Sequence, residues 1–198
     1  MITAQGKIPT DITVACSGGV DSMAIANFLQ RKHNVKLLFI HHLTKTSDDA
    51  LKFLQPYTNK NNIDFECRYI RDKKPTKGKE NYWREERYRI FYSHKAPIIT
   101  CHHLDDCVET WIWSSLHGTG KIIPYRHANV IRPFRQNKKE EFVNWCERND
   151  VPWIEDKTNE DTKYMRNFIR HQMMDSVLVV NRGIHKTIRK KILAEDVS

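Results

Sequence analysis

A short serine- and glycine-rich segment follows directly on an apolar run in this chain. The apolar run is Ile12-Thr13-Val14-Ala15-Cys16, and the segment after it is Ser17-Gly18-Gly19-Val20-Asp21-Ser22. The β-branched residues of the run predict a strand, and Ile25, Phe28 and Leu29 predict a helix after the turn. A strand that turns directly into a helix directs free backbone N–H groups, and the positive end of the helix dipole, toward one point. Such a point binds phosphate.

The side chains of this turn also suit a phosphate ligand. Gly18 and Gly19 have no Cβ, so the backbone can approach an anion closely. Ser17 and Ser22 add hydroxyl donors, and the Asp21 carboxylate can hold Mg²⁺ between phosphates. The alternative is an ordinary Ser/Gly turn in which Asp21 only caps the helix. The patterns of a Walker A loop and of a dinucleotide-binding loop are both absent, which excludes those two site types.

The composition is that of a globular protein with a basic surface. The 198 residues suffice for one domain with a full core, and 29% of them are charged. No apolar run reaches membrane-spanning length and residues 1–11 carry no secretory signal, so we expect a cytoplasmic protein with no membrane partner. The formal net charge of +9 indicates a polyanionic partner such as nucleic acid, although solvated lysines alone produce a similar charge.

The cysteines are dispersed and form no C-x-x-C pair. They are Cys16, Cys67, Cys101, Cys107 and Cys146. This arrangement is typical of reduced, mostly buried thiols and argues against a zinc site or an iron–sulfur cluster.

Short apolar segments alternate with helical patterns, which predicts an α/β fold with a parallel sheet. The predicted strands cover residues 12–16, 35–41, 65–70 and 97–101, and the predicted helices cover 22–33, 47–60, 80–94 and 105–117. Further on, a short strand is expected at 130–131 and helices near 138–149 and 161–174. Residues 73–79 are basic and contain Pro75 and Gly78, so we expect a mobile loop there.

Three of the predicted strands end in polar, titratable residues. These ends are Cys16-Ser17, His41-His42 and Cys101-His102-His103. Ligands of open parallel sheets bind outside the carboxyl ends of the strands, so we expect these groups to surround one crevice. His41-His42 taken alone is also consistent with a structural pair, one ring packed and the other exposed.

Acidic residues follow the last of these strand ends. If a helix starts near Leu104 or Asp105, then Asp106, Glu109 and Thr110 lie on one face. Helix capping alone also favours acids in a first turn. Two adjacent histidines on a strand end point in opposite directions and cannot chelate a metal together. We therefore expect a histidine that acts beside phosphate or a nucleobase, as donor or general base.

Arginines recur at helical spacing in two further segments. Arg84 and Arg87 share a predicted face with Tyr88, and Arg166 and Arg170 are one turn apart with Asn167 beside them. Guanidinium groups bind phosphate in a bidentate manner, which favours contact with phosphate or RNA. The alternative is a solvated basic face.

Taken in order, these segments resemble the N-terminal catalytic domain of the tRNA(Ile)-lysidine synthetases, a family of the ATP-pyrophosphatase (PP-loop) superfamily. The matching blocks are Ser17 to Ser22, His41-His42, Arg84-Glu85-Glu86-Arg87-Tyr88, His102-His103-Leu104-Asp105-Asp106 with Glu109-Thr110, Arg132-Pro133, Asp156-Lys157-Thr158-Asn159 and Arg166-Asn167-Phe168-Ile169-Arg170. The resemblance covers about residues 11–174. It implies a Rossmann-like fold, with an ATP-binding catalytic domain at 1–135 and a basic helical extension at 136–198, or one continuous domain.

The resemblance also implies a two-step reaction on an isoleucine tRNA with a CAU anticodon. ATP adenylates the C2 oxygen of the wobble cytidine and pyrophosphate leaves; the ε-amine of free lysine then displaces AMP and forms lysidine. The implied catalytic residues are Asp21, His103, Asp106 and Glu109, and Asp21 is also the implied Mg²⁺ ligand. The implied ATP contacts are Ser17, Gly18, Gly19, Val20, Asp21, Ser22 and His41. The implied RNA contacts are Arg84, Arg87, Arg132, Arg166, Asn167 and Arg170.

Two departures from the family leave alternatives open. Family members usually continue into C-terminal domains that bind the tRNA body, whereas this chain ends at Ser198 after a basic tail at 182–191. The longer N-terminal lead is also missing, so we expect a minimal version of the family. The alternatives are another PP-loop enzyme, either a tRNA thiolase or an amide-forming synthetase, and a catalytically silent module that binds RNA or nucleotide.

Overall fold

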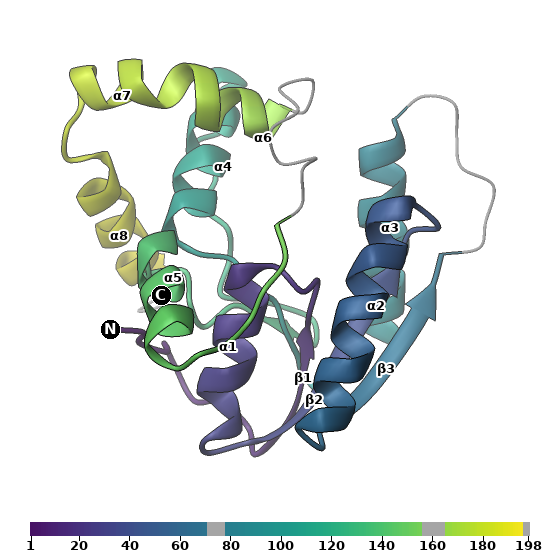
Figure 1. The fold of residues 1–198 in the computed structure, drawn as a ribbon. Helices are drawn as coiled ribbons and strands as arrows, with labels where there is room; N and C mark the ends of the chain where they lie inside the picture. The colour runs from purple at the N-terminus through teal and green to yellow at the C-terminus, as the bar shows by residue number, and fades with distance from the viewer. Residues whose placement is uncertain (71–77, 156–164, 196–198) are drawn as a thin grey trace.

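The computed structural model describes residues 1–70, 78–155 and 165–195, and Figure 1 shows how they are arranged. A twisted sheet with the strand order β3-β2-β1-β4-β6-β5 forms its centre. The strands are β1 Asp11–Ala15, β2 Asn34–His41, β3 Asp64–Tyr69, β4 Ile98–Ile99, β5 Arg126–His127 and β6 Val130–Ile131. Every neighbouring pair is parallel except β5 and β6. The predicted α/β fold is confirmed, and the antiparallel edge pair is an addition that the sequence analysis did not foresee.

The helices around the sheet agree with the predicted ranges to within three residues at each end. They are α1 Val20–Gln30, α2 Lys45–Lys60, α3 Lys79–Ser93, α4 Leu104–Leu116 and α5 Lys139–Arg148. Successive side chains of a strand point to opposite faces of the sheet, so neighbouring residues pack against different helices. Val14 and Leu37 belong to the core that contains α1, α2 and α5, whereas Leu38 and Ile98 face α3.

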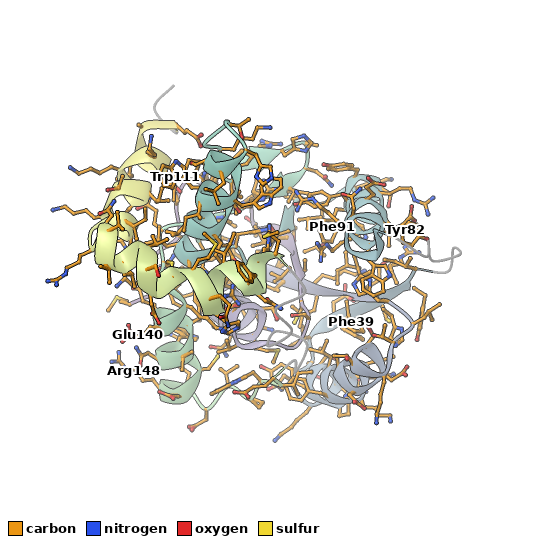
Figure 2. All side chains as sticks on the ribbon, turned by 90° about the horizontal axis from the view of Figure 1, so that it is seen from above. Phe39, Tyr82, Phe91, Trp111, Glu140 and Arg148 are labelled. Carbon is orange, nitrogen blue, oxygen red and sulfur yellow. The ribbon has the colours of Figure 1, made fainter. Side chains whose placement is uncertain are left out.

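A second apolar core joins α4 to the C-terminal helices. These helices are α6 Met165–Phe168, the π-helical segment η2 Ile169–Met173, α7 Met174–Val180 and α8 Ile184–Glu195. Leu104, Val108 and Ile112 of α4 pack with Ile188 and Ile192 of α8. Figure 2 shows Trp111 of α4 on one side of the molecule and Tyr82 and Phe91 of α3 on the other. A pocket lies between α4 and α3.

Some expectations fall on residues outside the described ranges. The predicted mobile loop at 73–79 lies almost entirely within 71–77, and the Asp156-Lys157-Thr158-Asn159 block lies within 156–164. The predicted helix at 161–174 is described only from Met165 onward. The division at residue 135 stays a prediction. Among the described residues, no helix combines the length and apolarity needed to span a membrane.

All five cysteines lie within the described ranges, and each is a free thiol. Burial raises the pKa of Cys16, the residue directly after β1, and its hydrogen bonds with the Ser22 hydroxyl and the Gly18 backbone offset part of this effect. These thiols therefore behave as packing groups, as the sequence predicted.

Candidate functional site

The turn between β1 and α1 leaves the N-terminal amides of α1 free of side-chain caps. Gly19 is the N-cap residue and makes no side-chain capping bond. The Ser22 hydroxyl accepts from the Ser17 N–H at 3.2 Å and donates to the Gly19 carbonyl at 2.9 Å, which fixes the turn from within. The uncapped amides and the dipole of α1 are thus directed toward one point, an arrangement that suits an anion.

A distant segment of the chain packs over this turn. The Ile154 N–H donates to the Gly18 carbonyl at 2.9 Å. Gly18 has a φ of +85°, and a Cβ there would lie 3.2 Å from two Ile154 side-chain carbons and 3.4 Å from Phe53. Glycine is therefore needed at position 18 both for the left-handed backbone and for this contact.

Asp21 faces an acidic and imidazole cluster at the N-terminus of α4. His103 Nε2 lies 3.7 Å from Asp21 Oδ2 and 3.6 Å from Asp106 Oδ2, and its Nδ1 lies 3.5 Å from Asp105 Oδ2. His103 is also the N-cap of α4, because its Nδ1 accepts from the Asp106 N–H at 3.3 Å while Asp106 Oδ2 accepts from the His103 N–H at 3.0 Å. The structure thus brings together three of the predicted catalytic residues, Asp21, His103 and Asp106.

Burial and charge act in opposite directions on these carboxylates. Burial raises the pKa of Asp21, although His103 and Lys139 offset part of that rise. Burial also disfavours the charged form of Asp106, but the nearby His103 and His102 outweigh it and hold the pKa of Asp106 below its usual value. Asp106 is therefore ionised at neutral pH, and Asp21 is the more basic of the two.

Glu109, the fourth predicted catalytic residue, is paired with Arg170. Arg170 Nε and Nη2 donate to the two Glu109 carboxylate oxygens at 2.7 and 3.2 Å, and Nη2 lies 3.7 Å from Asp106 Oδ1. Burial raises the pKa of Glu109, and Arg170 offsets part of this rise. The helix carries its π-helical turn at this point, over Ile169–Met173. Arg170 was predicted to contact RNA, and the structure places it against these carboxylates.

A pocket of about 480 Å³ lies beside this cluster, between α3, α4 and the 121–124 segment. Its lining residues include Arg84, Tyr88, His102, Thr110, Arg132 and Arg166. His102 directly precedes His103, and Thr110 lies one helical turn after Asp106 on α4, so the pocket lies next to the cluster. Three arginines and Lys121 line the pocket together with one acidic residue, Glu85, so the lining carries an excess of positive charge. The pocket therefore suits an anionic or strongly polar ligand.

His102, rather than His103, lines this pocket, and its Nδ1 lies 3.0 Å from the Thr100 hydroxyl. Burial is the main cause that lowers the pKa of His102 to about 3; Asp106 opposes it, and Arg132, Arg166 and Arg87 act in the same direction as burial. His102 is therefore a neutral imidazole at physiological pH, able to donate or accept a hydrogen bond but unsuited to carry a positive charge.

The variant His102→Gln is expected to flatten the pH dependence of stability. The folded chain lowers the pKa of His102 from 6.5 to about 3, so the unfolded chain takes up the proton first as the pH falls. The stability that neutral His102 contributes is present above pH 6.5 and is lost toward pH 3, by about 1.5 kcal/mol between pH 6.5 and 5. Urea unfolding across this range measures it. His117→Gln, at an exposed histidine, is the control, and an equal change in both variants would contradict the assignment.

Two further residues that were predicted to contact ligands, His41 for ATP and Arg132 for RNA, make contacts within the protein. His41 is buried, its Nδ1 accepts from the Leu43 N–H at 3.1 Å, and its Nε2 lies 3.1 Å from Asp48 Oδ1. Both ring nitrogens therefore hold the turn after β2. Arg132 is also buried, and it donates to the Pro124 carbonyl and the Tyr88 hydroxyl at 3.0 and 3.1 Å.

The remaining arginines and Asn167 lie around the pocket or on the C-terminal helices. The Arg84 guanidinium lies 5.1 Å from the centre of the Tyr88 ring, which it faces. Arg87 is half-buried on α3, and Asn167 is buried on α6. The sequence analysis did not identify Tyr88, Thr110 or the 121–124 segment as pocket residues. Only the contacts between distant segments reveal them.

Three comparisons relate this arrangement to known proteins. The model of the PP-loop domain matches residues 3–177. The tRNA(Ile)-lysidine synthase of Thermosipho africanus is 32% identical over 191 residues, which cover 86% of this chain and 44% of that protein. The enzyme of the same name from Francisella philomiragia is 30% identical over 94% of this chain and 51% of its own. The chain spans about half the length of the curated relatives it matches.

A solved structure supports the fold. The NH3-dependent NAD synthetase from Campylobacter jejuni superimposes with a TM-score of 0.52 at 13% sequence identity, over 96% of this chain and 87% of that one. At this identity the similarity concerns the Rossmann-like arrangement of sheet and helices alone.

Proposed function

Since this chain belongs to the PP-loop domain family, we propose that it is an ATP-dependent ligase that adenylates the wobble cytidine of an isoleucine tRNA and joins free lysine to the activated base. The observation that carries this proposal is the convergence at Asp106. Asp21 and His103 belong to the cluster around that carboxylate, and the pocket that His102 and Thr110 line lies next to the cluster. Relatives that cover most of this chain are named tRNA(Ile)-lysidine synthase.

In the first step, the C2 oxygen of cytidine attacks the α-phosphorus of ATP, the bond to the β-phosphate breaks and pyrophosphate leaves. The difficulty is negative charge that accumulates on the phosphates. The uncapped amides at the start of α1 supply fixed positive dipoles there, and Ser17 and Ser22 hold the turn in place. Such preorganised donors stabilise a transition state because they need not reorient during the reaction.

Mg²⁺ fits one feature of this site. Asp21 Oδ1 is buried and has no hydrogen-bond partner among the described residues. Proteins hold Mg²⁺ through one or two carboxylates together with phosphate oxygens, so Asp21 is the ligand that we assign. No three His, Cys, Asp or Glu side chains in the described part of the chain are placed to bind a metal together. When bound, the ion neutralises charge on the triphosphate.

In the second step, the ε-amine of lysine attacks C2, the bond from C2 to the adenylate oxygen breaks and AMP leaves. Lysine arrives as an ammonium ion, so it must be attracted and must then lose a proton. Asp106 is our candidate base, because it is ionised and adjoins the pocket. His103 and Glu109 support it, the latter through Arg170.

RNA would reach Asp106 through the pocket. Arg84 and Arg166 provide positive charge there, and Tyr88 provides an aromatic ring. We assign Arg84, Arg87, Arg166 and Asn167 to RNA contacts, and we assign Arg132 and Arg170 to holding Tyr88 and the carboxylates. A reaction that consumes ATP and tRNA belongs in the cytoplasm, where we place it.

The variant Gly18→Ala is expected to weaken ATP binding about tenfold, which corresponds to 1.4 kcal/mol. Its Cβ would lie 3.2 Å from Ile154, and the φ of +85° disfavours any side chain, so we expect the turn to be displaced by a few tenths of an ångström. Gly118→Ala is a matched control, because Gly118 has a φ of +78° and its Cβ would meet nothing within 4 Å. Calorimetric titration with ATP measures the difference. Equal losses in the two variants would show that backbone strain alone, and not the turn, determines binding.

The proposed function is tested with the whole chain, ATP, labelled lysine and total bacterial tRNA. Incorporation of lysine that requires tRNA and is lost in Asp21→Ala supports the proposal. Release of pyrophosphate without lysine transfer would leave an adenylating PP-loop enzyme with another acceptor. ATP binding without pyrophosphate release, whatever RNA is offered, would favour a silent binding module.

A further inference from the structure

We propose that His185 of α8 is a positioning residue that orients His103 through Asp105, so that the C-terminal helix is part of the adenylation site. The proposal rests on the proposed function for its kinetic test, while its structural test needs no RNA. It concerns two residues, His185 and Asp105, to which the two-step mechanism above gives no role.

Helix α8 is docked firmly at the base of α4. Ile184, Ile188 and Ile192 recur at every fourth position and are all buried in the core that α4 shares. Two polar contacts flank this apolar stripe. His185 Nε2 lies 2.9 Å from Asp105 Oδ1, and Arg189 Nη2 donates to the Gln136 carbonyl at 2.9 Å. The backbone of α8 is therefore fixed when these side chains make their contacts.

Asp105 joins α8 to the site. Its Oδ1 contacts His185, and its Oδ2 accepts from the Lys139 N–H at 3.0 Å. Asp105 is partly buried, and burial alone would raise its pKa; the bonds to His185 and Lys139 outweigh burial and hold the pKa far below the usual value. The carboxylate is thus a fixed negative charge at the point where α4, α5 and α8 meet.

This charge lies directly behind the His103 ring. Asp105 Oδ2 is 3.5 Å from His103 Nδ1, the nitrogen that accepts the Asp106 N–H. Because Nδ1 accepts that bond, a neutral His103 carries its hydrogen on Nε2, which lies between Asp21 Oδ2 and Asp106 Oδ2. Nδ1 then has no hydrogen to donate to Asp105, so the carboxylate acts on the ring through its charge at 3.5 Å. A shift of that charge is expected to change the orientation of the ring and the position of Nε2 relative to the two carboxylates.

Removal of the partner that orients such a group typically costs about 10- to 100-fold in activity, by analogy with the outer partners of metal-bound histidines. His185→Ala is expected to lower kcat for pyrophosphate release about tenfold while KM for ATP stays within twofold, because the phosphate-binding turn is untouched. His185→Gln keeps an N–H donor of similar reach and is expected to restore most of the rate.

Arg189→Ala is the matched control, because it removes another polar contact of α8 without touching Asp105. It is expected to leave kcat within twofold of the wild type. Equal loss in Arg189→Ala and His185→Ala, or failure of His185→Gln to restore the rate, would overturn the proposal and reduce the contact to a support for α8.

The ring of His103 is also observed directly, by NMR of ¹⁵N-labelled imidazole groups in the whole chain. The His103 signals are assigned by their loss in His103→Gln. They are expected to shift in His185→Ala and to stay in place in Arg189→Ala, and unshifted signals in His185→Ala would refute the proposal. If the wild-type chain releases no pyrophosphate, the proposed function is wrong. The NMR spectrum still shows in that case whether His185 positions the His103 ring.

Discussion

Asp21→Asn is expected to slow ATP-dependent pyrophosphate release by about 10²- to 10³-fold, the usual loss when one preorganised charge or donor at a reacting centre is removed. The substitution keeps the size of the side chain but removes its negative charge. The buried Oδ1 then holds a cation far less strongly, and His103 loses one of the two carboxylates that its Nε2 faces. Pyrophosphate release is measured at several Mg²⁺ concentrations, and the variant is expected to require more Mg²⁺ for half-maximal rate.

The control for this prediction is Asp11→Asn. Asp11 is the first residue of β1, the strand that leads into the turn; it is exposed and accepts from the Asn34 side-chain amide at 2.8 Å. It has the same residue type as the test position, but it lies at the far end of β1 from the turn. Asp11→Asn is expected to retain the wild-type rate and Mg²⁺ requirement. A wild-type rate in Asp21→Asn would remove Asp21 from the catalytic assignment.

Arg170→Met is expected to destabilise the fold by about 3–5 kcal/mol, the cost of leaving a buried charge without its partner. The Glu109 side chain is 3% exposed and receives both of its short contacts from Arg170. The double variant Arg170→Met with Glu109→Gln removes the charge as well as its partner and is expected to recover more than half of the loss. Urea unfolding of the four members of this cycle gives the coupling free energy.

Arg166→Met is the companion variant, one turn earlier in the sequence. Arg166 lines the pocket, so its loss is expected to cost less than about 1 kcal/mol of stability. If Arg166→Met and Arg170→Met destabilise the fold equally, Arg170 has no special role in the buried pair. A double variant no more stable than Arg170→Met would lead to the same conclusion.

The sheet and its helices could be predicted because their signals are local. The β-branched run before Ser17 and the four-residue spacing within α2 each determine an element without reference to the rest of the chain. Two features could not be predicted in this way. Strand β6 was expected at 130–131 and is confirmed, but its antiparallel partner β5 is only two residues long and was not foreseen. The π-helical turn at Ile169–Met173 was missed because a search for a period of 3.6 residues does not distinguish it from ordinary helix.

The sequence led us to expect polar residues together at the ends of the strands, but it did not show which partner each of them contacts. The adjacent histidines were expected to act near phosphate, yet sequence spacing could not show that His103 caps α4 while His102 enters the pocket. Arg166 and Arg170 were expected on one side of a helix in contact with RNA. The buried Glu109 binds Arg170 instead, a contact across 61 positions in the sequence. Long-range pairing of this kind has no local pattern.

The separation of the pocket from the turn between β1 and α1 has a consequence for inhibitor design. None of residues 17–22, all of them within the described ranges, lines the pocket of about 480 Å³. If the turn binds the phosphates of ATP as proposed, a small polar anion that occupies the pocket alone would leave that turn free. A single compound with a nucleotide at one end and a pyrimidine mimic at the other would have to pass Asp106. The length and charge of its linker, rather than either end group, would then determine selectivity over other nucleotide-binding proteins.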